Sequence, residues 1–159
     1  MADYLEQRSR GVIAQWPIAA LRIYAGLFFA YHGLSKLQRG NFADGMSGFL
    51  TSTLDASFSF YRPFLEHVVL PHKALFAGMV MWGESLAGVA LVLGLATRYA
   101  ALVAAFLAMN FWFAKGQALF GGQNHDVVWM IVMLVIAFIP AGRIAGLDAR
   151  LADRLRFLR

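Results

Sequence analysis

Two ionisable residues of opposite charge, Arg22 and Glu84, lie inside long apolar stretches of the sequence. An ionisable side chain deep in a bilayer is costly, so it is normally paired and often functional. Counted along helices from the ends of their stretches, both lie about 15 Å in, near the middle of a hydrocarbon core about 30 Å thick. Asn110 falls at a similar depth in the next stretch. We predict one buried cluster, which would either bind a polar ligand or hold the helices together.

A second polar group gathers toward the opposite ends of the same stretches. His32 and Lys36 are four residues apart, so they share one helix face. His125 and Asp126 open the last apolar stretch on the same side. Imidazole and carboxylate at a membrane surface could pass a proton or hold a polar ligand. The structural alternative is that Lys36 extends to the interface and Asp126 caps its helix.

The composition excludes several other kinds of site. The chain has no cysteine, so it forms no disulfide and holds no cysteine-ligated metal or iron–sulfur cluster by itself. Its four histidines show no pair at metal-ligand spacing, and we predict no metal. The net charge of +5 is spread along the chain, and we expect no nucleic acid partner. Aromatic side chains near Glu84 could hold a flat ring such as a quinone, whereas a haem would need His32 and His125 at equal depth on their two helices.

The elements that must position these residues are apolar helices. Hydrophobic residues make up 60% of the 159-residue chain, against roughly 45–50% in ordinary soluble domains. They fall in four blocks, at about 12–37, 74–95, 98–115 and 126–141, with Pro17 placed where a helix can start. In lipid the backbone must satisfy its own hydrogen bonds, which favours helices. We predict an all-α fold, a four-helix transmembrane bundle forming a single integral membrane domain over 1–159.

The segments outside these blocks are also informative. The outer loop 38–73 is too long for a simple connection. Within it Phe42, Met46, Phe49, Leu50 and Leu54 recur at helical spacing. They predict a short amphipathic helix, which lies in the interface, re-enters the membrane or covers the bundle as a lid. The basic C-terminal tail 143–159 predicts a surface helix that contacts membrane lipid headgroups.

Lysine and arginine are distributed unequally between the two sides of the predicted bundle. With four crossings, both termini share a side with the turn around Arg98. That side carries eight Lys and Arg residues, against five on the other. The positive-inside rule therefore predicts that both termini are cytoplasmic.

Several short motifs occur in order along the chain. They are Leu21–Arg22, Gly26–Leu27–Phe28, His32–Gly33, Lys36–Leu37, Glu84, Gly88, Leu93–Gly94–Leu95–Ala96–Thr97–Arg98, Ala100–Ala101, Met109, Gly142–Arg143 and Leu147–Asp148. As an ordered set over about residues 18–150, they resemble the DoxX family. The resemblance implies a small four-helix protein of the bacterial inner membrane. The family is often labelled as oxidoreductases and is similar to the small membrane subunit of thiosulfate:quinone oxidoreductase. Some members work with a sulfurtransferase and superoxide dismutase.

Three functions stay open at this stage. The first is a membrane oxidoreductase component that binds a quinone or similar polar-headed lipid. Its candidate catalytic residues are Glu84, Arg22 and His32, and its candidate ligand contacts are Arg22, Lys36, Glu84, Asn110, His125 and Asp126. The second is a non-catalytic scaffold that recruits a soluble redox or sulfurtransferase partner. The third is a small solute or proton carrier, for which four short helices give room only in a homo-oligomer.

Overall fold

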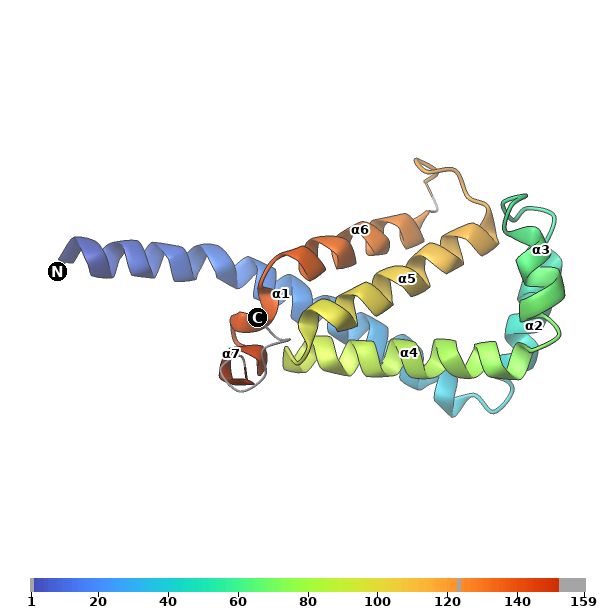
Figure 1. Cartoon of the computed structure of the whole chain (residues 1–159), viewed down its shortest axis with the longest axis horizontal. Helices are drawn as coiled ribbons and strands as arrows, with labels where there is room; N and C mark the ends of the chain where they lie inside the picture. Colours follow the sequence, from blue (N-terminus) through green and yellow to red (C-terminus); the bar gives the residue numbers. More distant parts are fainter. Residues whose placement is uncertain (1, 123, 152–159) are drawn as a thin grey trace.

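Four long helices form the body of the molecule. The computed structural model describes residues 2–122 and 124–151, with side chains from residue 16 onward. The long helices are α1 (Ala2–Gln38), α4 (Lys73–Leu93), α5 (Thr97–Lys115) and α6 (His125–Phe138). Helix α1 packs along α4, α4 along α5, and α5 along α6 (Figure 1). The all-α prediction is confirmed.

The helix boundaries correct the sequence prediction in two places. Helix α1 begins at Ala2 rather than near residue 12, so Pro17 lies inside the helix and does not start it. The predicted start near residue 12 marks where the sequence becomes apolar, which is not the same as where the helix begins. Residues 2–10 are mostly polar but contain no glycine or proline, so they can form a helix in water. Helix α6 ends at Phe138 rather than at 141. Ile139 is extended, as expected for a residue that precedes a proline.

The turn between α4 and α5 makes these two helices an antiparallel hairpin (Figure 1). Gly94 ends α4 in the left-handed conformation at φ +63°, and its N–H bonds to the carbonyls of Ala90 and Leu91. Glycine adopts this conformation without steric cost, which explains its place here. Ala96, at φ +47°, also lies in the left-handed region just before α5.

Helices α1 and α4 approach closely because glycines face each other. A Cβ added at Gly88 would collide with the backbone of Ala30, and one added at Gly26 would lie 2.7 Å from Val92 N. A Cβ at Gly33 would collide with Ser85. Three contacts of this kind fix the register of the two helices. That register decides which polar side chains meet.

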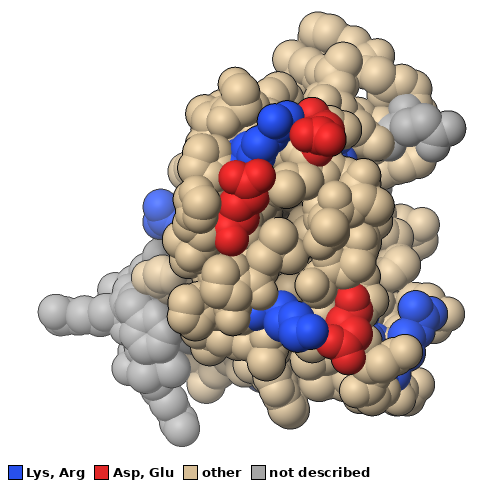
Figure 2. All heavy atoms as spheres, turned by 90° about the vertical axis from the view of Figure 1, so that its right-hand side faces the viewer, with Lys and Arg blue, Asp and Glu red and all other residues tan. Residues whose placement is uncertain are grey.

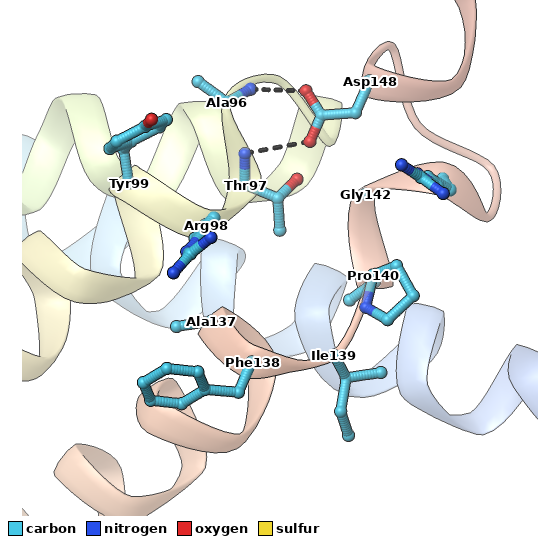
Figure 3. A pocket seen from close by; sticks show the side chains of 12 residues that line it. Ala96, Thr97, Arg98, Tyr99, Ala137, Phe138, Ile139, Pro140, Gly142 and Asp148 are labelled. Carbon is cyan, nitrogen blue, oxygen red and sulfur yellow. Dashed lines mark hydrogen bonds between the residues drawn. The ribbon is translucent and has the colours of Figure 1, made fainter. Parts of the chain in front are cut away.

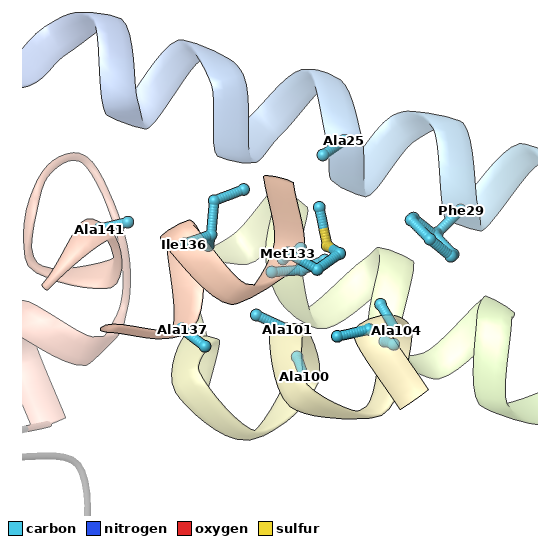
Figure 4. Close-up of a cluster of buried hydrophobic side chains, with 12 residues drawn as sticks. Ala25, Phe29, Ala100, Ala101, Ala104, Met133, Ile136, Ala137 and Ala141 are labelled. Atoms are coloured by element: carbon cyan, nitrogen blue, oxygen red, sulfur yellow. The ribbon is translucent and has the colours of Figure 1, made fainter. Parts of the chain in front are cut away.

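The core is made mainly of small side chains, while many large apolar ones face outward. Ala25 and Phe29 of α1 pack over Met133 and Ile136 of α6 and a row of α5 alanines (Figure 4). On the outside, Trp82 is 57% exposed, and Leu86 and Phe106 are similar. A soluble domain rarely presents so much contiguous apolar surface.

A cap covers the end of the bundle away from the termini (Figure 1). It consists of α2 (Phe42–Thr53), α3 (Arg62–Phe64) and η1 (Leu65–Val69). Leu50 of α2 is buried with Leu65, Val69 and Ala114. The predicted amphipathic helix in loop 38–73 is therefore present, and it packs over the bundle as a lid. Seen from this end, basic and acidic side chains lie beside one another (Figure 2).

The chain after α6 folds back against the α4–α5 turn. It contains η2 (Ala141–Arg143) and α7 (Asp148–Leu151). The N–H groups of Leu147 and Asp148 donate to the carbonyls of Leu93 and Gly94. The Asp148 carboxylate accepts from Ala96 N at 2.7 Å and Thr97 N at 3.0 Å, so it caps the start of α5. The rest of the predicted surface helix lies outside the described residues.

Candidate functional site

Glu84 is buried and paired, but its partner is Lys36. The Lys36 ammonium donates to both carboxylate oxygens at 2.5 Å. The Glu84 side chain is 4% exposed and that of Lys36 is 21% exposed. The Lys36 ammonium also lies 5.5 Å above the ring of Phe42 and 5.3 Å above that of Phe111. This pair links α1 to α4, and removing either partner would leave the other charge without compensation.

The structure does not bring Arg22 and Glu84 together, which corrects the predicted cluster. Arg22 is fully buried, yet it lies beside Gly94 and Gly146 at the end of α4. Its Nη2 donates to the carbonyl of Ala145 at 3.1 Å. Fourteen residues of α1 separate it from Lys36, or roughly 21 Å along the helix axis. The depth estimate placed the start of the bundle at residue 12, whereas the glycine contacts set Arg22 level with the α4–α5 turn.

Asn110 also lies apart from both charges. Its side-chain oxygen accepts from the hydroxyl of Tyr61 at 2.5 Å, and its amide donates to the carbonyl of Phe106. Tyr61 belongs to the cap, between α2 and α3, and burial raises its pKa to about 12. Asn110 therefore ties the cap to α5 and is not a member of the charged cluster.

A pocket of about 470 Å³ collects most of the other predicted residues. His32 and Lys36 enter it from α1, Glu84 from α4, and His125 and Asp126 from α6. Of the first predicted polar group only Glu84 lines this cavity, where it joins all four residues of the second group. Arg22 and Asn110 are not among its lining residues.

Aromatic rings form the wall of this pocket between α1 and α6. The rings of Phe28 and Trp129 are stacked with centroids 4.2 Å apart and planes 23° apart. The rings of Phe28 and His32 lie 4.3 Å apart, and Phe29 meets Trp129 edge-on at 5.9 Å. The closely packed helix pairs are α1 with α4, α4 with α5, and α5 with α6, so α1 and α6 are not a closely packed pair. Side-chain rings therefore close the seam between α1 and α6.

A second ion pair lies at the mouth of the pocket. Lys115 donates to Asp126 at 2.7 Å, and the Asp126 side chain is 13% exposed. The alternative that Asp126 caps α6 is incorrect, because Asn124 holds that position and accepts from Val127 N. The pocket thus contains two lysines, two carboxylates and two histidines, with no net formal charge when the histidines are neutral. Among the described residues, no group of three His, Asp or Glu side chains is placed to hold a metal ion.

We expected a few aromatic side chains near Glu84 without singling out Phe28, Phe111 or Trp129, and we did not predict Lys115 as a pocket residue. A usable signal existed for two of them. Phe28 precedes His32 by four residues and Trp129 follows His125 by four, so each shares a helix face with a predicted site residue. Lys115 ends α5, and its pairing with Asp126 depends on how the 116–124 loop returns to α6. That placement could not be read from spacing.

These features define the class of protein. It is an all-α protein, and within the described residues α4 and α5 are each long and apolar enough to cross a membrane, while α6 is apolar but shorter. The family model described as DoxX matches residues 18–117, so the chain belongs to the DoxX family. Family membership and the two apolar helices together indicate a membrane protein. Neither the curated proteins nor the solved structures that were compared gave a match.

Proposed function

We propose that the protein is a membrane-embedded oxidoreductase subunit that binds a quinone, or a similar polar-headed ring. The ligand would lie in the pocket of about 470 Å³ that contains Lys36 and Glu84, which we call the α1–α6 pocket. The observation that carries this proposal is the position of the Lys36–Glu84 pair beside the stacked rings of Phe28 and Trp129. Such a site offers hydrogen-bonding charge and a flat apolar wall within one cavity. It replaces the Arg22/Glu84 site inferred from the sequence.

The size and chemistry of the pocket suit such a ring. Small-molecule sites commonly measure roughly 300–1,000 Å³, with apolar walls and a few polar groups that fix orientation. The pocket, at about 470 Å³, falls within this range. Lys36 and a protonated histidine nitrogen are donors suited to carbonyl oxygens. Phe28 and Trp129 already stack on each other with centroids 4.2 Å apart, so a bound ring would pack edge-on against this pair rather than insert between its two rings.

Each polar residue then has a distinct task. A bound quinone would supply electron transfer that is coupled to protons. Lys36 would donate a hydrogen bond to one ring oxygen, and Glu84 would hold Lys36 in position. His32 lies on the same α1 face as Lys36 and could hold a proton beside the ring. Asp126 and Lys115, which pair at 2.7 Å, would contribute a second polar contact from α6 and α5.

Four crossings by α1, α4, α5 and α6 fit the same proposal. Large apolar side chains cover the outward faces of all four helices, including Leu27, Met79, Val103 and Ile131, each more than 40% exposed. A ring-bearing lipid could then approach the seam between α1 and α6 from the bilayer. The DoxX resemblance implies a bacterial inner membrane, and the distribution of Lys and Arg favours an orientation with both termini cytoplasmic. A soluble redox partner would supply the electrons, whereas a sulfurtransferase partner would bring a sulfur substrate whose oxidation supplies them.

The test is quinone binding by the full chain in nanodiscs. Removing an aromatic ring that packs against the ligand costs about 0.5–1.5 kcal/mol beyond the lost area, so Trp129→Ala should weaken binding several-fold. Lys36→Met should also weaken it, because a charged hydrogen bond is lost. Trp82→Ala is the matched control, since Trp82 is 57% exposed and does not line the pocket. Equal affinity in the wild type, Trp129→Ala and Lys36→Met, with the fold intact, would overturn the proposal.

A further inference from the structure

A separate pocket lies at the other end of the bundle, between the start of α5 and the segment that follows α6 (Figure 3). It measures about 390 Å³ and shares no lining residue with the α1–α6 pocket. Arg98 and Tyr99 line it from α5, while Phe138, Pro140 and Arg143 line it from the chain after α6. It therefore joins charged and apolar surface at the end of two apolar helices.

The charge of this pocket favours an anion. Arg98 is exposed among its lining residues, and the one carboxylate there, that of Asp148, is buried. The Asp148 carboxylate already caps α5 through Ala96 N and Thr97 N (Figure 3). Arg98 lies in the first turn of α5, where the helix dipole disfavours a cation. An external anion next to Arg98 would offset this unfavourable interaction with the helix dipole.

Thr97 supplies an independent sign of a polar ligand. It lines the pocket and is only 3% exposed, and its hydroxyl has no hydrogen-bond partner within the described part of the chain. A buried hydroxyl without a partner is costly. An acceptor that enters the pocket and takes a hydrogen bond from this hydroxyl would remove that cost.

Apolar surface continues from the pocket along the outside of α5 and α6. Phe138, at the rim, is 72% exposed, and Val135 and Val103 are each 45% exposed. A free phosphate would use only the arginines and the hydroxyl. A phosphate that carries acyl chains would use this apolar surface as well.

We infer that this pocket binds the phosphate of an anionic phospholipid, with Arg98 and Thr97 as headgroup contacts and the α5–α6 surface as the acyl contact. The inference does not depend on the quinone site. The bound lipid would lie at the end of the bundle where the α4–α5 turn is found. There the lipid would join α5 to the segment after α6.

The experiment measures lipid affinity of the full-length chain in detergent by thermal shift. The probes are phosphatidylglycerol, phosphatidylcholine with the same acyl chains, and inorganic phosphate. We expect phosphatidylglycerol to raise Tm in a saturable way, and the other two to have little effect. Arg98→Gln should weaken phosphatidylglycerol binding about fivefold, the factor for one basic side chain at a membrane surface. Thr97→Val should weaken binding while leaving the lipid-free Tm equal or higher.

Arg150→Gln is the matched control, because Arg150 is an exposed arginine of α7 that does not line the pocket. It should bind phosphatidylglycerol as the wild type does. An equal loss in Arg98→Gln and Arg150→Gln would indicate general surface attraction and would overturn the inference. Stabilisation by inorganic phosphate equal to that by phosphatidylglycerol would also overturn it, in favour of a free anion site. So would wild-type affinity in both Arg98→Gln and Thr97→Val.

Discussion

Removing Lys36 from its ion pair should destabilise the protein substantially. Breaking a buried pair typically costs about 3–5 kcal/mol, because the remaining charge is left without a partner. The Glu84 side chain is 4% exposed and that of Lys36 21%, so solvent near Lys36 should reduce the cost of Lys36→Met to about 2–3 kcal/mol. In a protein of this size about 1 kcal/mol shifts Tm by ~2–4 °C. The expected loss in Tm is therefore about 4–12 °C.

The assay is a double-mutant cycle measured by unfolding in detergent. Lys36→Met combined with Glu84→Leu should be less destabilised than the two single changes predict, because the double variant buries no unpaired charge. Lys73→Met is the control. Lys73 pairs with Asp44 at 2.6 Å, but both side chains are largely exposed, so Tm should change little. Strict additivity of Lys36→Met and Glu84→Leu would refute the assignment of Lys36 as the partner of Glu84.

The same cycle distinguishes the two possible partners of Glu84. Arg22→Met and Glu84→Leu should be additive within about 0.5 kcal/mol, as expected for residues more than 7–10 Å apart. A coupling above about 1 kcal/mol between Arg22 and Glu84 would restore the predicted cluster.

Three other expectations follow from named contacts. Gly88→Ala should destabilise by about 1–3 kcal/mol or more, since the added methyl collides with the Ala30 backbone. Gly78→Ala, where the methyl meets nothing within 4 Å, should stabilise by about 0.5–1 kcal/mol; both are read from Tm, and equal effects would contradict the α1–α4 register. Burial raises the pKa of Tyr61 to about 12, so a spectrophotometric titration should show one tyrosine that ionises near pH 12. That ionisation step should be absent in Tyr61→Phe. Because the folded pKa lies above the unfolded value of about 10, this group's contribution to stability is complete below pH 10 and is lost as pH rises toward 12. Asp148→Asn should cost about 0.5–2 kcal/mol through the weakened α5 cap, and an unchanged Tm would contradict it.

The sequence predicted the helices well because their signals are local. The apolar blocks placed α4 and α5 within two residues of the observed bounds. The periodicity of Phe42, Met46 and Leu50 predicted α2. The membership of His32 and Lys36 in one polar group also followed from helical spacing. All these inferences need only the geometry of one helix.

The pairing of Arg22 with Glu84 failed because it needed the register between two helices. The equal depth of Arg22 and Glu84 was counted from the ends of the apolar stretches. Hydropathy does not show where α1 begins or in which register α1 packs along α4. Close contacts at Gly26, Gly33 and Gly88 decide that register. They place Lys36, not Arg22, opposite Glu84. Aligning α1 and α4 by their facing glycines places Gly33 level with Glu84 and Ser85. Lys36 lies about one helical turn after Gly33, so this alignment brings it near Glu84.

Photoaffinity labelling with an azido-quinone, followed by peptide mapping, tests the quinone proposal most directly. It would use the full chain in nanodiscs, with unlabelled quinone as competitor. The account predicts labels on α1 around Phe28 and on α6 around Trp129, lost on competition and in Lys36→Met. Labels confined to the outward faces of α4 and α5, with none between α1 and α6, would contradict it.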